Sequence, residues 1–172
     1  LGARRDQMAG TLSGGQQPMD SVARVATRAC DALVTGTAFV VAPGYLVTNA
    51  HVVAGASQVR VAAGDAIADA MVVMFDPDLD IAVLHAPDVE APSLDFADDV
   101  PDRGTTGAAL GYAGGGPLVV LPAGVTGAYP ATGRDIYDEY HVTRDIIELR
   151  APVEPGDSGG PFVLPDGTVG GV

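Results

Sequence analysis

The feature that most constrains this chain is a succession of short β-rich segments, each closed by glycine, proline or aspartate. Residues 35–42 (TGTAFVVA) and 45–50 (YLVTNA) are rich in β-branched and aromatic residues and flank the turn dipeptide Pro43-Gly44. No long stretch with a 3.6-residue helical period competes with this pattern, which is typical of an all-β sandwich or barrel. We predict further strands over 21–29, 58–62, 67–75, 80–85, 105–111, 117–126, 140–150 and 160–164.

Composition narrows the class of protein. The chain has 172 residues and is 47% hydrophobic, which suffices for one domain or two small subdomains around a sizeable core. Its net charge of −13 excludes nucleic acid as a partner, because phosphate contacts need a basic surface. No apolar run reaches the roughly 18 residues of a membrane span.

Two segments are predicted to lie outside the core. Residues 1–20 are polar and glycine-rich, which predicts a flexible linker or tail. The acidic, proline-containing segment 86–104 predicts a surface connection between two halves of the fold.

The string GDSGGP at 156–161 is the strongest functional motif. A serine hydroxyl is a weak nucleophile until a base takes its proton. It also needs backbone N–H groups nearby to hold the negative oxygen that forms in acyl transfer. Glycines around Ser158 permit a tight turn that leaves the N–H groups of Gly156 and Ser158 facing outward. We therefore predict Ser158 as a nucleophile and Gly156 and Ser158 as an oxyanion hole; a plain hairpin loop is the alternative for a glycine-rich string taken alone.

Two further segments supply a base and an acid. His51 lies in TNAHVV (48–53), directly after a predicted strand, and is a candidate general base for Ser158. Asp80 abuts the apolar run 81–84, so its carboxylate is drawn inward and needs a hydrogen-bond donor such as a histidine Nδ1–H. Asp76 and Asp78 are interpreted as residues of an acidic turn.

The order His51, Asp80, Ser158 is that of the chymotrypsin-type catalytic triad. Together, TNAHVV, DLDIAVL and GDSGGP resemble the trypsin-like (chymotrypsin-fold) serine proteases, and TGTAFVVAPGYLVTNAHVV followed by DPDLDIAVL resembles their HtrA-related branch. Within it, ELRAPVEPGDSGGPFVLPDGTVGGV is similar to the actinobacterial, membrane-tethered periplasmic MarP-like proteases of acid resistance. The resemblance covers residues 21–172.

This resemblance implies an all-β fold of two perpendicular six-stranded β-barrels with the triad between them. The first barrel is expected over 21–95, with His51 and Asp80, and the second over 96–172, with Ser158. A trypsin-like domain continues past the strand that holds Gly170, so we expect an incomplete second barrel, truncated at its C-terminus, that leaves Val169 and Val172 uncovered. It also implies a membrane tether through a missing N-terminal segment and a periplasmic or extracytoplasmic location.

Cys30 is the single cysteine, which leaves a buried thiol or one half of a disulfide as alternatives. In MarP-like proteases a disulfide joins a cysteine near the start of the protease domain to one near its end, and Cys30 matches the first. The family's specificity pocket has its floor shortly before the nucleophile, here at 151–153, without an acid, so a preference for Arg or Lys is not expected. Glu154 is assigned to a solvated loop.

The prediction is a serine endopeptidase that acts on protein or peptide substrates, requires no cofactor or metal and forms an acyl-enzyme on Ser158. The alternatives are an HtrA-like protease-chaperone and a catalytically silent, peptide-binding trypsin-like domain.

Three other residues stand out. HtrA relatives usually carry asparagine at the position of Asp157, and an aspartate here resembles that of proteases in which this acid pairs with a new N-terminus. His85 and His141 have no partner motif and are interpreted as surface or strand residues.

Overall fold

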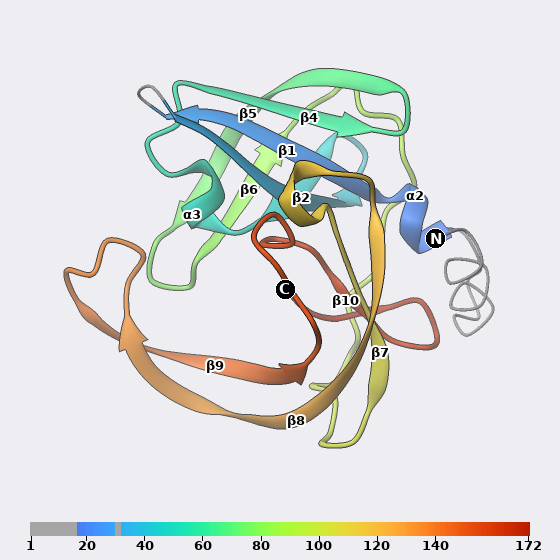
Figure 1. The fold of residues 1–172 in the computed structure, drawn as a ribbon, viewed down its shortest axis with the longest axis vertical. Coiled ribbons are helices and arrows are strands. Elements are labelled where there is room, and N and C mark those ends of the chain that lie inside the picture. Colours follow the sequence, from blue (N-terminus) through green and yellow to red (C-terminus); the bar gives the residue numbers. More distant parts are fainter. Residues whose placement is uncertain (1–16, 30–31) are drawn as a thin grey trace.

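A computed structural model describes residues 17–29 and 32–172 of the protein. Two β-rich halves follow one another along the chain (Figure 1), the first drawn blue to green and the second yellow to red. The strands of the first half are β1 (Val22–Ala29), β2 (Ala32–Ala42), β3 (Tyr45–Thr48), β4 (Gln58–Ala63), β5 (Ala66–Asp76) and β6 (Ile81–His85). Those of the second are β7 (Thr106–Gly111), β8 (Val119–Arg134), β9 (His141–Arg150), β10 (Phe162–Val163) and β11 (Val169–Gly171).

The first six strands form a closed barrel in the order β1-β2-β3-β6-β5-β4, every neighbouring pair antiparallel. Alternation along the strands decides which side chains enter it: in β4, Val59 and Val61 are buried while Arg60 between them is exposed. Closure leaves this half with no free sheet edge. Its interior is filled by alanines and valines together with two leucines, namely Ala23, Val25, Ala38, Val40, Leu46, Val59, Val61, Ala68, Ala82 and Leu84.

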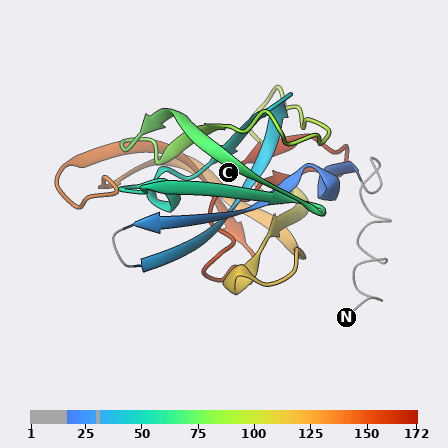
Figure 2. The same ribbon diagram turned by 90° about the horizontal axis from the view of Figure 1, so that it is seen from above.

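The other five strands form one sheet in the order β11-β10-β7-β8-β9, which curls into a nearly closed second barrel. Figure 2, the view from above, shows the first barrel in front of the second. The predicted all-β, two-barrel architecture is thus confirmed.

Several local predictions are corrected by the structure. The strand predicted over 45–50 ends at Thr48, because Ala50–Val53 forms the one-turn helix α3. The end of the predicted linker, Gln17–Asp20, is the one-turn helix α2, while residues 1–16 and Cys30 lie outside the described residues. No helix in the described ranges is long and apolar enough to cross a membrane.

A second hydrophobic cluster joins the two barrels. Phe39 of β2 and Leu110 of β7 are both fully buried in it, and Phe39 also meets the ring of Phe96 edge-on at 6.0 Å. Val169 of β11 belongs to the same cluster and is 1% exposed, so the prediction that this side chain is left uncovered is wrong. It packs in the cluster between the barrels, and its backbone pairs with the connecting segment: its N–H donates to the Asp95 carbonyl at 2.8 Å and its carbonyl accepts the Ala97 N–H at 2.9 Å. Val172 is 46% exposed, as expected.

The β8–β9 hairpin makes a second connection between the barrels. Its strands pair from Gly124↔Arg150 to Arg134↔His141, so β8 runs well past its predicted end at 126, while β9 matches the predicted strand 140–150. In Figure 1 the orange loop at its tip reaches the green turn between β5 and β6. There Ile136 packs against the core of the first barrel, and Arg144 donates hydrogen bonds to the carbonyl oxygens of Pro77 and Asp78. The second barrel therefore touches the turn that precedes Asp80.

The packing of β7 against β10 predicts a strict requirement for glycine at 107. A Cβ there would lie 2.4 Å from the Val163 carbonyl oxygen and 2.7 Å from the Phe162 ring. Gly107→Ala should therefore lower the free energy of unfolding by about 1–3 kcal/mol, as overpacking does in other cores. The matched control is Gly133→Ala in β8, where a Cβ meets nothing within 4 Å. Chemical denaturation of both variants tests this; equal stability would contradict it.

Candidate active site

His51 is presented to solvent by the short helix α3. Val52 and Val53, the next two residues, are 2% and 4% exposed and anchor the turn in the first barrel. The imidazole lies on the opposite side, where its side chain is 44% exposed. One helical turn with a buried apolar side thus fixes where the histidine lies while leaving its ring accessible.

Asp80 holds this turn through both its carboxylate and its carbonyl. Oδ2 lies 2.8 Å from His51 Nδ1, and Oδ1 accepts the His51 backbone N–H at 2.9 Å. The Asp80 carbonyl accepts Ala50 N–H at 3.1 Å and Asn49 Nδ2 at 2.8 Å. Asp80 has φ of +58°, an uncommon value for a residue with a Cβ, and this conformation lets both groups face residues 49–51. With Nδ1 facing a carboxylate, the other ring nitrogen is left to act as a base.

The pair shifts the pKa of each member in the direction that favours opposite charges. The hydrogen bond to Asp80 raises the pKa of His51 above 6.5, burial opposes this, and the charge of Asp80 adds to it. Burial raises the pKa of Asp80. Hydrogen bonds from the His51 ring and backbone, together with the charges of His51 and Arg144, lower this pKa by more than burial raises it, so the net value is below 3.8. Both shifts stabilise an imidazolium beside the carboxylate, the species formed when the histidine takes a proton.

The turn before Asp80 is held from two sides. Asp76 Oδ1 accepts the backbone N–H groups of Asp78 and Leu79 at 3.0 and 2.8 Å, which confirms its interpretation as a turn residue. Arg144 of β9 binds two carbonyl oxygens of the same turn from the second barrel. The position of Asp80 therefore depends on contacts from both barrels.

Ser158 lies in a loop that is docked on the first barrel. Its carbonyl oxygen accepts the backbone N–H of Thr37 at 2.8 Å. The next residue, Gly159, has φ of +82°, and a Cβ there would lie 2.3 Å from both the Thr37 carbonyl and Thr48 Oγ1. No other residue fits at this point, which gives a physical reason for a glycine directly after the serine. Ser158 is thereby placed beside the segment that leads into α3.

The peptides around Ser158 have their carbonyl groups engaged and two N–H groups unused. The carbonyl of Pro155 accepts Gly114 N–H at 2.6 Å, and that of Asp157 accepts Gly160 N–H at 2.9 Å. Within the described residues, the N–H groups of Gly156 and Ser158 donate no hydrogen bond. In a trans peptide the carbonyl and the following N–H point in opposite directions, so the two anchored carbonyls aim these N–H groups away from the loop. Such a pair suits the stabilisation of a negative oxygen.

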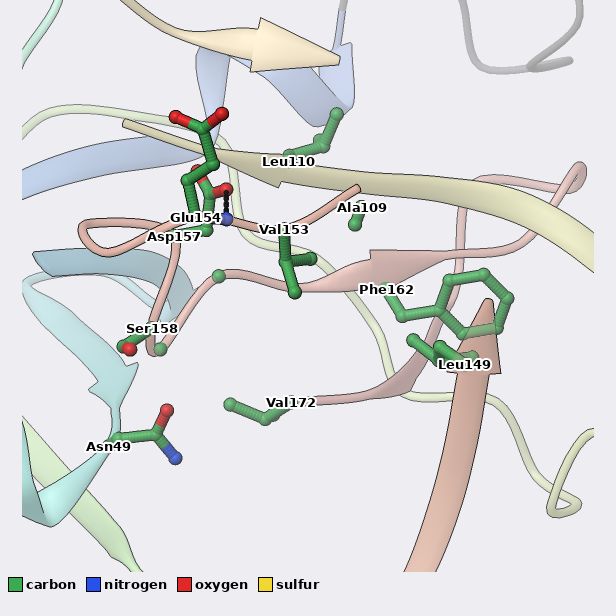
Figure 3. Close-up of a pocket in the computed structure, with 12 residues that line it drawn as sticks. Asn49, Ala109, Leu110, Leu149, Val153, Glu154, Asp157, Ser158, Phe162 and Val172 are labelled. Carbon is green, nitrogen blue, oxygen red and sulfur yellow. Dashed lines mark hydrogen bonds between the residues drawn. The ribbon is translucent and has the colours of Figure 1, made fainter. Parts of the chain in front are cut away.

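A cavity of about 210 Å³ lies beside Ser158 (Figure 3). In the close-up, Ser158 and Asn49 lie at one end, Phe162 and Leu149 at the other, and the Glu154 carboxylate points away from Ser158. The wall is mostly apolar and contains Ala109, Leu110, Leu149, Val153, Phe162 and Val172. The floor of the specificity pocket is predicted at 151–153, and of these residues Val153 lines the cavity. Glu154 is exposed at the rim of the cavity. The cavity suits an uncharged side chain next to the serine.

The sequence profile described as "Trypsin-like peptidase domain" matches residues 36–172. The chain belongs to this family. The predicted resemblance to trypsin-like proteases, their HtrA-related branch and the MarP-like proteases is confirmed by the relatives described next.

Serine protease Rv3671c of Mycobacterium tuberculosis, a MarP, is 45% identical over 144 residues, which are 83% of this chain and 36% of that protein. The crystal structure of the active form of that protease matches with a TM-score of 0.86 at 42% identity, over 91% of this chain and 69% of the other. A probable periplasmic DegP-like serine endoprotease of Chlamydia pneumoniae is 37% identical over 145 residues, 81% of this chain and 28% of that protein. A structure of the HtrA-type protease AlgW with a tripeptide matches with a TM-score of 0.76 at 30% identity, over 94% of this chain and 52% of the other. The chain thus spans about a third of the length of the curated relatives it matches.

Measured against the sequence prediction, the structure brings His51 and Asp80 into direct contact. Ser158 lies across from them on the second barrel, and within the described residues no hydrogen bond joins its Oγ to His51 Nε2. Such bonds are often long in unliganded sites and tighten when substrate binds. Of the other histidines, His85 stacks on Tyr45 at 4.8 Å and His141 is exposed.

Sequence reasoning missed three contributors to the site. Thr37 and Asn49 stand in the quoted strings, but nothing in their local pattern indicates a contact with the serine loop or the Asp80 carbonyl. Arg144 lies far away in sequence, on β9. Besides these three, Asp157 accepts the Glu154 N–H through Oδ2 at 2.9 Å, while its buried Oδ1 has no hydrogen-bond partner among residues 17–29 and 32–172.

The His51–Asp80 pair predicts a stability difference confined to a pH window. A raised histidine pKa contributes stability that is full below 6.5 and is lost as the pH rises through the folded value. A lowered aspartate pKa contributes stability above 3.8 that is lost as the pH falls through the folded value. Asp80→Asn should therefore lower the Tm most between pH 3.8 and 6.5 and least in alkali. Thermal unfolding across this range measures it.

The control for this experiment is Asp78→Asn. Asp78 is exposed, lies in the same turn and carries the same charge, but its carboxylate has no hydrogen bond to His51. This variant should show no such pH window. If Asp78→Asn and Asp80→Asn give the same profile, the effect comes from net charge and the assigned pairing is wrong.

Proposed function

We propose that the chain is the catalytic domain of a serine endopeptidase in which Ser158, His51 and Asp80 form the triad. The observation that carries the proposal is the double contact of the Asp80 carboxylate with the ring and the backbone of His51, 2.8 and 2.9 Å long. This contact orients a histidine whose side chain is 44% exposed. The serine loop, with two unused N–H groups and an adjoining apolar cavity, supplies the remaining parts of an acyl-transfer site.

In the proposed reaction, His51 Nε2 accepts the proton of Ser158 Oγ as that oxygen attacks the carbonyl carbon of the substrate. The carbonyl π bond breaks, and the resulting oxyanion accepts hydrogen bonds from the N–H groups of Gly156 and Ser158. Collapse of this intermediate breaks the C–N bond, and His51 returns its proton to the leaving amine. Water then attacks the acyl ester with His51 again acting as base, which releases the acid and regenerates Ser158.

Asp80 supports each proton transfer without accepting the proton. Its carboxylate stabilises the imidazolium and holds the ring orientation, since its own pKa is below 3.8. The raised pKa of His51 means that the base is protonated in acid. Hydrolysis should therefore accelerate with rising pH through an apparent pKa above 6.5.

For the whole protein we propose a membrane-tethered, periplasmic or extracytoplasmic protease that acts in stress or acid resistance. The similarity to DegP-like proteins named as probably periplasmic supports an extracytoplasmic location. The HtrA-like protease-chaperone is the second candidate, favoured by the 37% identity to the DegP-like protein. Cell fractionation of the full protein separates a tethered protease from one released with the periplasmic contents.

The proposed triad predicts that Ser158→Ala abolishes catalysis. Loss of the nucleophile removes several orders of magnitude in kcat in related triads, while the fold is preserved. A fluorophosphonate probe should label the wild-type protein covalently and leave Ser158→Ala unlabelled. Ser57→Ala is the matched control, because Ser57 is exposed and its hydroxyl donates to the Arg28 carbonyl at 3.1 Å, not to a residue of the site. A wild-type protein that the probe does not label would favour the catalytically silent, peptide-binding alternative.

The cavity beside Ser158 predicts a preference for apolar side chains at the residue before the cleaved bond. Its wall is mostly apolar, its volume is about 210 Å³ and the Glu154 carboxylate at its rim points away from Ser158, so a charged group entering it would lose more water contacts than the wall replaces. In a series of peptides that differ only at that residue, kcat/KM should be higher for Val or Leu than for Arg or Asp by about tenfold or more. Preference for Arg would show that the substrate side chain binds elsewhere.

A further inference from the structure

Thr37 contacts the serine loop from the first barrel although it lies far from Ser158 in sequence. It is fully buried in β2, beyond the point where β3 ends at Thr48. Because the neighbouring strand has ended, the main-chain groups of Thr37 on that side find other partners. Its N–H donates to the Ser158 carbonyl at 2.8 Å, and its carbonyl accepts Thr48 Oγ1 at 2.6 Å.

The hydroxyl of Thr37 bridges two separate loops of the second barrel. Oγ1 donates to the Gly156 carbonyl at 2.7 Å and accepts the Tyr112 backbone N–H at 3.0 Å. A carbonyl can only accept and an N–H can only donate, so the role of the hydroxyl in each bond is fixed. A single buried side-chain oxygen thus satisfies one acceptor and one donor of the backbone beside Ser158.

These two bonds determine how the peptides of the serine loop are turned. The Gly156–Asp157 peptide is held at both ends, by Thr37 Oγ1 on its carbonyl and by the Glu154 carbonyl on its N–H at 3.0 Å. Tyr112 begins the short segment in which Gly114 N–H binds the Pro155 carbonyl at 2.6 Å. That bond in turn sets the direction of the Gly156 N–H, because the two groups belong to one trans peptide.

We infer that Thr37 is a positioning residue of the oxyanion hole, whose buried hydroxyl holds the Gly156 carbonyl and the Tyr112 amide so that the Gly156 N–H faces the substrate. This inference rests on the proposed function, since it assigns a role relative to that reaction. It adds a contribution from the first barrel to a hole built entirely from backbone of the second.

Removal of the hydroxyl should affect the loop rather than Thr37 itself. The Gly156 carbonyl would lose the hydroxyl that donates to it and the Tyr112 N–H would lose this acceptor, and Gly156 is itself buried. A loop with an unpaired buried carbonyl can rotate that peptide to reach water or another donor. Such a rotation disturbs Gly156, and with it the N–H that the transition state requires.

The test compares Thr37→Val, Thr37→Ala and Thr37→Ser in the full chain. Val and Ala lack the hydroxyl, whereas Ser retains it. We expect kcat for peptide hydrolysis to fall at least about tenfold in Val and Ala, towards the 10²–10³ that follows loss of one oxyanion-hole donor elsewhere, with KM changed little. Thr37→Ser should restore kcat to within about threefold of wild type. Affinity for a peptide trifluoromethyl ketone, which forms an oxyanion on the serine, should fall in parallel with kcat.

The control is Thr126→Val. Thr126 is half-buried in β8, and its hydroxyl donates to the Glu148 carbonyl at 3.1 Å and to the Glu148 carboxylate at 2.9 Å, which belong neither to the serine loop nor to α3. It should keep kcat when this is measured below the unfolding transition. Equal kcat losses in Thr126→Val and Thr37→Val, unchanged kcat in Thr37→Val and Thr37→Ala, or failure of both of those variants to fold would overturn the inference.

The same series separates this inference from the proposed function. If fluorophosphonate labels the wild type and spares Ser158→Ala, the proposed function stands whatever Thr37→Val does. If the wild type is not labelled, the proposed function fails and the inference fails with it.

Discussion

The docking of the serine loop onto the first barrel is the constraint on which the rest of the site depends. The candidate base and acid belong to one barrel and the candidate nucleophile to the other, so their separation is set by how closely the two backbones approach. That approach is made at Thr37, whose N–H binds the Ser158 carbonyl and whose own carbonyl leaves no space for a Cβ at Gly159. Main-chain contacts of this kind tolerate little displacement, because a shift of a few tenths of an ångström breaks the bond or creates an overlap.

The same contact explains why the early end of β3 matters. If β3 continued past Thr48, as its sequence predicts, it would occupy the side of β2 that the serine loop uses. Instead the chain turns into α3, whose buried valines anchor it and whose exposed side carries His51. One local change, from strand to a single helical turn, therefore places the base and at the same time frees the backbone that receives the nucleophile loop.

Asp80 performs the corresponding task on the other side of the site. Its left-handed backbone conformation is stabilised by four hydrogen bonds to residues 49–51. The turn before it is held by Asp76 and, from the second barrel, by Arg144. Since Arg144 and Thr37 reach across in opposite directions, each barrel contributes to the position of a group carried by the other. A rigid relation between the barrels is thus supported at two separate points as well as by the apolar cluster between them.

The sequence by itself determined the fold class, the approximate position of most strands and the identity of the candidate residues His51, Asp80, Ser158 and Gly156. These follow from local patterns: alternation of side chains, turn residues, and a polar group beside an apolar run. The tertiary structure decided the helical turn at 50–53, the burial of Val169, the extension of β8 to Arg134 and the roles of Thr37 and Arg144. No local sequence pattern indicates any of these features. Each depends on which atoms distant in sequence come within hydrogen-bonding or van der Waals distance of one another. Only the packing of the complete chain fixes those distances.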